Sequence, residues 1–174
     1  MSHEMSRAIV ATGDNIEADE MRAAMEQDAK QDGLRLFQMR SQLPSKGRVD
    51  NLLAATDRMW VVLKAYASAG ENHLHAHPNE DHIFVVLQGE AEFFGADGVG
   101  SIAKKHWGVM LPRGAFYRFR ATSEEQLVML RVGAQTRDDV DPLEFIDVDG
   151  RSLTNDPKAN YRAPTVFAPG QFFE

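Results

Sequence analysis

Between residues 59 and 133 the sequence consists of short strand-like segments separated by turn signals. The clearest segment is residues 59–66, in which a single lysine interrupts a run of apolar and aromatic side chains. Further candidate strands are residues 82–87, 90–95, 100–105, 107–111, 115–121 and 126–133. Glycine and proline mark the turns between them, as at Gly89 and residues 112–114. Many short strands at close spacing predict an antiparallel β-sandwich or barrel.

The segment before the strands has a helical rather than a strand-like spacing of apolar residues. Residues 16–32 carry apolar side chains at helical spacing in an acidic context, which predicts an amphipathic helix. Asp14 or Asn15 would cap its start, and Gly33 its end. The apolar stripe consists of Ile16, Met21, Ala24, Met25 and Ala29. We expect this stripe to pack on the barrel or on a second subunit rather than to bind a ligand.

The chain after residue 138 contains proline and glycine breakers, and it predicts an extended tail that packs on the body of the protein. Its expected anchors are Phe167, Phe172 and Phe173. The sequence thus divides into an N-terminal helical arm at residues 1–33, a β-barrel at residues 34–137 and a C-terminal extension at residues 138–174.

The composition indicates a single globular domain. A chain of 174 residues can bury a sizeable core, and no apolar run is long enough to span a bilayer. Residues 1–7 lack the layout of a signal peptide, so we expect a cytoplasmic protein without a membrane partner. The net charge of −7 argues against a nucleic-acid partner, which requires a basic face. Cysteine is absent, which excludes disulfides and thiolate ligands and leaves nitrogen and oxygen ligands for a metal.

Four of the six histidines fall within residues 73–82, before and at the start of a candidate strand. On an extended backbone His75 and His77 would point to the same side, since alternate residues share a face. A Pro-Asn pair then turns the chain, and His82 can return a third imidazole to the same point. Histidines that bind no ligand are the simpler interpretation, but the clustering favours a metal site.

Two neighbouring residues compete with His82 for the third position. His73 shares the face of the other two histidines if the strand extends that far, and otherwise it lies at the rim of a pocket. Glu80 could enter the site if the loop is bent. Asp81 would point away from it, because side chains alternate along a strand.

These residues resemble the first motif of the cupin superfamily. That motif reads glycine, five residues, His-x-His, three or four residues, glutamate, six residues, glycine. His75 and His77 supply the histidine pair. His82 stands at the glutamate position and Gly89 closes the motif. The opening glycine is displaced by one residue, to Gly70.

The second cupin motif reads glycine, five residues, Pro-x-Gly, two residues, histidine, three residues, asparagine. The Pro-x-Gly turn is present at residues 112–114, but Tyr117 stands at the histidine position and Ala121 at the asparagine position. His106 replaces the first glycine. The resemblance, over residues 55–133, is to a single-domain small cupin. It implies an all-β fold, a cupin-type antiparallel β-barrel (double-stranded β-helix or jelly roll), with an N-terminal helix and an extended C-terminal tail.

By this resemblance, one divalent transition metal is expected in the barrel. Cupins usually bind it through three histidines and one glutamate, and His75, His77 and His82 occupy three matching positions here. The candidate metals for such ligands are iron, zinc, manganese, nickel and copper. Tyr117 takes the place of the fourth ligand. It could bind the metal, act as a general acid or base, or only line the wall of the site.

The alternation along the strands also predicts the lining of a pocket. If His82 points inward, Phe84 and Val86 point inward as well. Phe119 shares the face of Tyr117 and would join them. An apolar, aromatic pocket beside a metal suits a small organic ligand.

Trp60 and Lys64 lie on one face of the 59–66 strand, and the sequence leaves open whether that face points inward. An inward Trp60 would line the pocket, and an inward Lys64 would anchor an anion. The outer row beside His82 is apolar too, so another layer must cover it. A second sheet, the N-terminal helix or the second subunit of a homodimer could supply that layer. The row consists of Ile83, Val85 and Leu87.

We expect a metal-dependent, dioxygenase-like enzyme that acts on a small organic acid, a diketone or an aromatic compound. Iron held by three histidines suits dioxygen chemistry, whereas zinc or manganese would favour isomerase, lyase or hydrolytic reactions. The alternative is a non-catalytic module that binds a small molecule or a metal, because the second motif has lost its histidine. No helix-turn-helix is evident, which disfavours a DNA-binding regulator.

Overall fold

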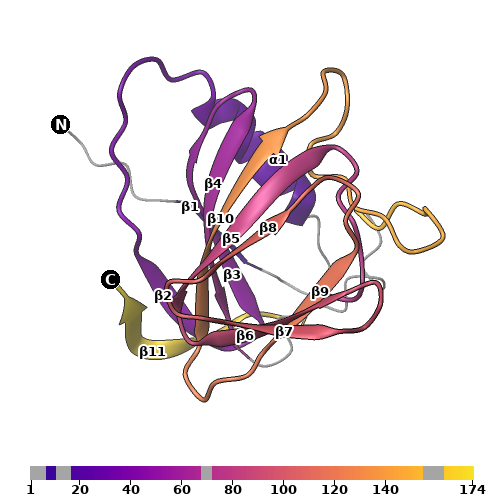
Figure 1. Cartoon of the computed structure of the whole chain (residues 1–174). Coiled ribbons are helices and arrows are strands. Elements are labelled where there is room, and N and C mark those ends of the chain that lie inside the picture. Colours follow the sequence, from indigo (N-terminus) through magenta and orange to yellow (C-terminus); the bar gives the residue numbers. More distant parts are fainter. Residues whose placement is uncertain (1–6, 11–16, 68–71, 155–162) are drawn as a thin grey trace.

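A curved six-stranded sheet and a smaller three-stranded sheet form the body of the protein (Figure 1). The computed structural model describes residues 7–10, 17–67, 72–154 and 163–174. Within them, the large sheet contains, in spatial order, β1 (Arg7–Val10), β3 (Arg48–Ala55), β4 (Met59–Tyr66), β10 (Leu127–Gln135), β5 (Glu80–Gln88) and β8 (Gly108–Leu111).

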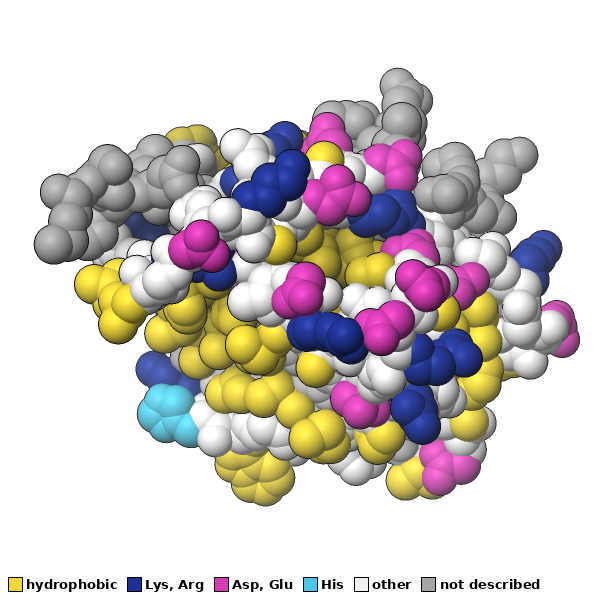
Figure 2. All heavy atoms as spheres, turned by 90° about the horizontal axis from the view of Figure 1, so that it is seen from above, with side chains coloured by type: hydrophobic (Ala, Val, Ile, Leu, Met, Phe, Trp, Pro, Cys, Tyr) yellow, Lys and Arg dark blue, Asp and Glu magenta, His cyan; other side chains and the backbone are white. Residues whose placement is uncertain are grey.

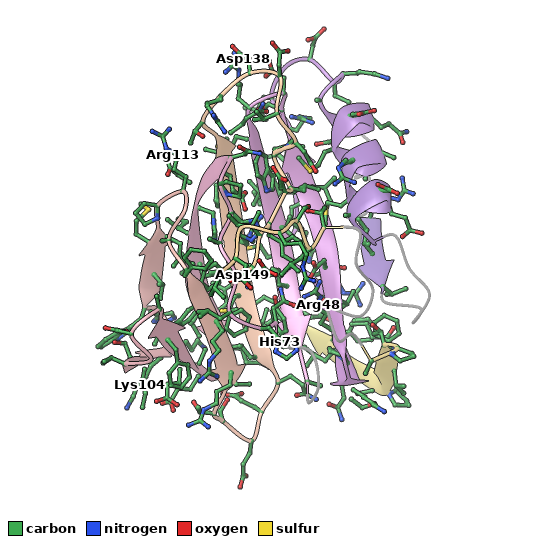
Figure 3. All side chains as sticks on the ribbon, turned by 90° about the vertical axis from the view of Figure 1, so that its right-hand side faces the viewer. Arg48, His73, Lys104, Arg113, Asp138 and Asp149 are labelled. Atoms are coloured by element: carbon green, nitrogen blue, oxygen red, sulfur yellow. The ribbon has the colours of Figure 1, made fainter. Side chains whose placement is uncertain are left out.

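The smaller sheet contains, in order, β7 (Gly100–Lys104), β6 (Glu90–Gly95) and β9 (Tyr117–Ala121). A two-stranded sheet joins β11 (Val166–Phe173) to β2 (Ser41–Lys46). The strand pairs of all three sheets are antiparallel. Helix α1 (Glu17–Asp28) runs alongside the strands on the β1 side of the large sheet (Figure 3). The expected antiparallel β-barrel with an N-terminal helix and a C-terminal tail is therefore confirmed, while the division into three segments at residues 33 and 137 stays a prediction.

The inner faces of the two larger sheets enclose the main hydrophobic core. Along β5, Phe84 and Val86 are buried while the residues between them are half-buried, as the alternation predicts. On β9, Tyr117 and Phe119 are buried and their arginine neighbours are exposed. All four buried side chains belong to one cluster, so the period of two along each strand places the apolar row inward.

Helix α1 covers the Trp60 end of β4, which the small sheet does not reach. Met21 and Met25 of the helix pack in one apolar cluster with Trp60 and Val62. The predicted stripe therefore contacts the barrel of the same chain. This contact closes one side of the interior with methionine side chains, which adapt to irregular gaps.

The helix ends earlier than its apolar pattern suggests. It stops at Asp28, whose carboxylate accepts hydrogen bonds from the Arg35 side chain and from the backbone N–H of Ala55. These bonds tie the end of the helix to β3 before the chain reaches Gly33, which adopts a positive φ of 86° in the following loop. The two candidate caps of the first turn lie outside the described residues: Asp14 and Asn15.

The β2–β11 pair covers the outer face of the large sheet. Leu63 and Ala65 of β4 are fully buried beneath it, and Phe167 and Phe173 of β11 pack against the same cluster. The third expected anchor, Phe172, is exposed by 42%. Residues 34–39 form no strand and cross the surface between α1 and β2.

No helix among the described residues is long and apolar enough to cross a bilayer. On the face shown in Figure 2, lysine and arginine side chains are interspersed with aspartate and glutamate around apolar ones. A nucleic acid binds a continuous basic surface, and the described part of this face mixes both signs of charge.

Candidate functional site

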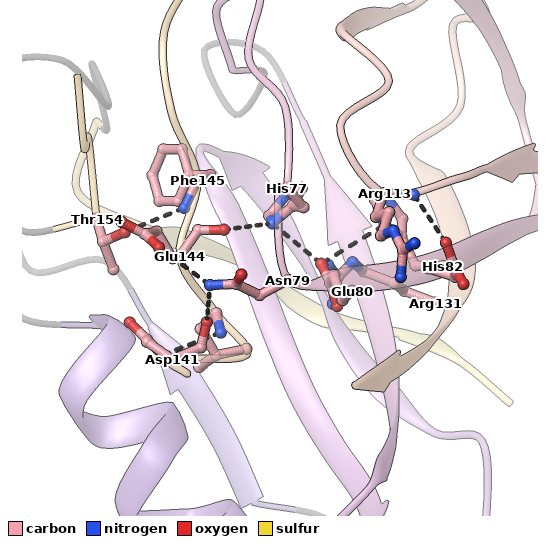
Figure 4. Close-up of polar contacts among 12 residues, drawn as sticks. His77, Asn79, Glu80, His82, Arg113, Arg131, Asp141, Glu144, Phe145 and Thr154 are labelled. Carbon is pink, nitrogen blue, oxygen red and sulfur yellow. Dashed lines mark hydrogen bonds and ion pairs between the residues drawn. The ribbon is translucent and has the colours of Figure 1, made fainter. Parts of the chain in front are cut away.

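The first residues of β5 bring a carboxylate and an imidazole onto the inner face of the large sheet. Strand β5 begins at Glu80, so Glu80 and His82 are two residues apart and point to the same side. They are 0% and 3% exposed. His77 approaches from the preceding segment, where its carbonyl oxygen accepts a hydrogen bond from the N–H of Gly114. The ligand atoms of His77, Glu80 and His82 lie within 4.8 Å of one another (Figure 4).

The carboxylate of Glu80 is the centre of this cluster. Its Oε1 atom lies 3.0 Å from Nδ1 of His77 and 3.5 Å from Nδ1 of His82. The same oxygen accepts a hydrogen bond from the guanidinium of Arg131 on β10. Gly133 makes room for this arrangement, since a Cβ at that position would collide with the Trp60 ring and the Glu80 carboxylate.

A polar support holds His77 from the other side. The segment after β10 pairs with the histidine segment, and the carbonyl oxygen of Glu144 lies 3.2 Å from Nδ1 of His77. The side-chain amide of Asn79 donates to the Glu144 carboxylate and to the carbonyl oxygen of Asp141 (Figure 4). These bonds restrict the His77 backbone and ring on the side away from β5.

Three polar atoms at this site are buried without a hydrogen-bond partner among the described residues. They are Nε2 of His75, Oε2 of Glu80 and Nδ1 of His82. A buried polar atom without a partner costs about 1–3 kcal/mol, so such an atom calls for a bound group. Imidazole nitrogen and carboxylate oxygen are both ligands of divalent transition metals. The donor set therefore fits a metal ion.

Burial keeps two of these histidines in the neutral form. It lowers the pKa of His75 to about 3, and the neighbouring His77 adds to the effect. Burial also lowers the pKa of His82 far below its ordinary value, and the charge of Arg131 lowers it further. Neutral imidazole is the form that binds metals, so protons do not compete with a metal at neutral pH.

His75 lies beside the cluster and is not one of its three candidate ligands, which are His77, Glu80 and His82. The backbone of His75 forms an isolated bridge with Tyr117, and its ring centroid is 5.2 Å from that of His77. Its Nδ1 is 2.6 Å from the carbonyl oxygen of His73. When Nδ1–H donates to that oxygen, Nε2 carries the lone pair. His73 itself is exposed (Figure 3).

Tyr117 closes the β9 side of the site. Its hydroxyl lies 3.1 Å from Nε2 of His82, and the whole residue is buried. Burial raises the pKa of the phenol above its ordinary value, so the hydroxyl keeps its proton. Tyr117 therefore contacts one candidate ligand and is available as a hydrogen-bond donor or acceptor.

A cavity of about 100 Å³ that opens to solvent adjoins the cluster. Trp60, Phe84 and Phe119 line it, together with His77 and Tyr117. Val86 lies deeper, fully buried in the core, and does not reach the cavity wall.

The residues that line the cavity show which face of β4 points inward. Trp60 and Lys64 both line it, so this face of β4 points inward. The Nζ atom of Lys64 lies 2.6 Å from a carboxylate oxygen of Asp50 on β3. Arg131 lines the cavity as well. The interior is thus both aromatic and charged.

The comparison with known proteins agrees with this architecture. Residues 61–133 match the family model described as the Cupin domain. This stretch of the chain is therefore a cupin domain. No curated protein matches the sequence of this chain.

Solved structures share its fold at low sequence identity. An uncharacterized conserved protein with a double-stranded β-helix domain from Klebsiella pneumoniae is 19% identical, with a TM-score of 0.52 over 59% of this chain and 90% of that one. An RmlC-like cupin from Shewanella frigidimarina is 14% identical, with a TM-score of 0.50 over 64% of this chain and 97% of that one. The cupin domain of a Schizosaccharomyces pombe protein is 17% identical, with a TM-score of 0.47 over 51% of this chain and 64% of that one. The chain therefore covers less than two thirds of the yeast structure.

Two charged residues of the site were not singled out from the sequence. Arg131 interrupts an otherwise apolar strand, and a lone arginine in such a strand is a signal of a buried ion pair. Asp50 lies in β3, whose polar residues obscured its strand character. Glu80 was considered only as a bent-loop alternative, although its spacing of two from His82 is the spacing of one strand face.

Proposed function

We propose that this chain is a metal-dependent cupin enzyme that acts on a small organic acid, a diketone or an aromatic compound. The proposal rests on buried ligand atoms of His75, Glu80 and His82 that have no hydrogen-bond partner within the described part of the chain and that lie beside a cavity. Such atoms destabilise the folded protein when nothing binds them, and a metal that binds them removes this cost. One divalent transition metal per chain is the expected cofactor.

The ligand set favoured by the geometry differs from the three histidines of the sequence pattern. His77, Glu80 and His82 make two imidazoles and one carboxylate, with His75 as a candidate fourth ligand. Two histidines and one carboxylate with open positions are typical of non-haem iron oxygenases. The metal, when bound, supplies Lewis-acid or redox chemistry at its open positions. We place dioxygenase-like chemistry first, and isomerase or lyase chemistry as the outcome for zinc or manganese.

The protein's own groups would orient these ligands. If His82 held the metal through Nδ1, its Nε2–H would donate to the Tyr117 oxygen, which lies 3.1 Å away. The carbonyl oxygen of Glu144 holds the ring of His77. Because Tyr117 also lines the cavity and keeps its proton, its hydroxyl can donate to a substrate oxygen.

A non-catalytic binding module is the second candidate function. The ion pair between Arg131 and Glu80 favours it, because this pair engages the carboxylate without a metal. Such a module would bind a small molecule, retain metal weakly and show no turnover.

The homodimer and the cytoplasmic location remain proposals. Part of the outer row that suggested a second subunit, Leu87, packs in the cluster beneath β2 and β11 of the same chain. The dimer therefore rests chiefly on the family resemblance.

Elemental analysis of the purified protein tests the metal site, with Glu80→Gln and His82→Ala as site variants. His106→Asn is the matched control, because His106 is exposed and Asn tolerates its positive φ of 72°. We expect one metal per chain in the wild type and the control, and a loss of about tenfold or more in metal affinity in both site variants. Oxygen consumption with acids, diketones and aromatic compounds then separates an oxygenase from a binding module. A wild type that stays metal-free after reconstitution contradicts the enzyme proposal.

A further inference from the structure

One buried and one half-buried ion pair lie on the inner face of the large sheet. Arg131 on β10 bonds to Glu80 on β5, and Lys64 on β4 bonds to Asp50 on β3. The two cations line the same cavity. They occupy diagonal positions on paired strands, because Arg131 is opposite Val62 and Lys64 is two residues further along β4. Diagonal neighbours lie about 7–8 Å apart at the backbone, so one anion can reach both side chains.

The two pairs differ in what their carboxylates do. Asp50 lies outside the group of candidate metal ligands, and its carboxylate holds Lys64. Glu80 belongs to that group, and the oxygen that accepts from Arg131 is the one nearest to both histidines. The second oxygen of Glu80, Oε2, has no hydrogen-bond partner among the described residues. A metal held by either oxygen would withdraw negative charge from the carboxylate on which the Arg131 guanidinium depends.

Sharing this carboxylate has a consequence for Arg131. A buried guanidinium that loses part of its anionic partner is strongly destabilised unless another anion replaces it. Arginine presents a planar fork of donors that matches a carboxylate. The replacement anion would bind at the cavity wall, where Arg131 and Lys64 both stand.

We propose that Arg131 and Lys64 form the subsite for the carboxylate of an organic acid, and that metal binding to Glu80 makes Arg131 available to it. This inference rests on the proposed metal site. Of the three ligand classes in the proposed function, an arginine–lysine subsite favours the organic acid. It also gives the binding events an order, with the metal before the acid.

The rest of the wall indicates the body of that acid. Its aromatic residues are Trp60, Tyr66, Phe84, Tyr117, Phe119 and Phe145. Such a wall contacts an apolar or aromatic group through stacked and edge-to-face arrangements. The ligand class is therefore an acid with an apolar or aromatic body.

Calorimetric titration with benzoate tests the subsite, and benzyl alcohol serves as the uncharged control probe. Zinc is the metal, because it has no redox chemistry. We expect zinc-loaded wild type to bind benzoate about tenfold or more tightly than the metal-free protein, since a cation released from a buried pair gains a new partner. Benzyl alcohol should bind both forms equally.

The E80Q variant separates the availability of Arg131 from the metal itself. It keeps the volume of the side chain and removes the charge that holds Arg131. Metal-free E80Q should bind benzoate about tenfold more tightly than metal-free wild type. The E80Q/R131M double variant should lose this gain, and it leaves no unpaired charge in the core that would prevent folding. Thermal unfolding checks that each variant is folded.

The outcomes distinguish the two proposals. If wild type binds zinc but neither zinc nor E80Q increases benzoate affinity, the carboxylate subsite is overturned and the metal site stands. If wild type binds no zinc, the proposed function fails, and the link between metal and acid fails with it. Benzoate binding by metal-free E80Q then still decides whether Arg131 forms an anion subsite.

Discussion

The two ends of strand β5 share one pattern of side chains but lie in different surroundings. At one end Phe84 and Val86 pack in the apolar core, and Phe84 also forms part of the cavity wall. At the other end Glu80 and His82 are equally buried, yet each has an atom without a partner among the described residues. The packed end stabilises the fold by itself, whereas the polar end is complete only with a bound group. Burial alone thus does not separate a core from a site, but unsatisfied polar atoms do.

The largest expected effect is on the packed end. Phe84 contacts the rings of His82, Phe119 and Tyr117, so Phe84→Ala should lower the free energy of unfolding by about 3–5 kcal/mol. Urea unfolding measures this loss. Phe37→Ala is the control, because Phe37 is 46% exposed and its truncation should change stability by about 0.5 kcal/mol or less. A loss below about 1 kcal/mol for Phe84→Ala would show that this end is not tightly packed.

Metal binding should affect the polar end and raise stability. Zinc at about 100 times its Kd should increase the free energy of unfolding of the wild type by about 2.7 kcal/mol. His82→Ala should show no such increase, whereas His106→Asn should respond like the wild type. Thermal unfolding with and without zinc measures the difference. An equal gain in all three proteins would place the metal elsewhere.

Gly133 on β10 lies opposite His82 of β5 and Trp60 of β4. A Cβ added there collides with the Trp60 ring and the Glu80 carboxylate, so Gly133→Ala should cost about 1–3 kcal/mol and weaken zinc binding. Gly108→Ala on β8 of the same sheet is the matched control, since its Cβ would meet the nearest atom at an ordinary 3.5 Å. Urea unfolding and zinc titration read out the two effects. Unchanged zinc affinity in Gly133→Ala would mean that Glu80 is not held in place at this point.

The pH response of the cavity wall gives the smallest expected effect. Burial lowers the pKa of Lys64 to about 8, partly offset by Asp50, while Arg48 and Arg131 lower it further. Lys64 is charged below this pKa and neutral above it. Benzoate affinity of metal-free E80Q should therefore fall as the pH rises through about 8.

The other charged groups near Lys64 do not change their charge in the pH range of this benzoate titration. Burial raises the pKa of Tyr66, and Lys64 with Arg48 keeps the pKa of Asp50 low despite its burial, so neither changes charge near pH 8. The two arginines stay charged. E80Q with Lys64→Met should bind benzoate more weakly and show a flat profile. A profile with the same fall in both variants would assign the titration to another group.

The strands of the barrel could be predicted where one side-chain period dominates. Residues 59–66 and 90–95 coincide with β4 and β6, because each combines strand-forming residues with clear turns at both ends. Strand β2 contains a proline, and β3 begins with polar residues that turn out to be buried in ion pairs and hydrogen bonds. Their strand character depends on pairing with distant partners, which overrides local pattern.

The site could be predicted in part for a similar reason. The inward direction of His82 and Tyr117 follows from alternation on β5 and β9. The role of Glu80 could not be predicted without knowing where β5 begins. The strand begins two residues earlier than the apolar pattern suggests. The pair between Arg131 and Glu80 joins residues 51 positions apart, and no local spacing encodes it.

The most direct test of a metal at the polar end of β5 is anomalous diffraction at a metal absorption edge, from crystals grown with that metal. We predict one strong peak between the side chains of His77, Glu80 and His82, with Arg131 turned toward the cavity. A metal-soaked crystal with no peak there, and with Glu80 still paired to Arg131, would contradict the account.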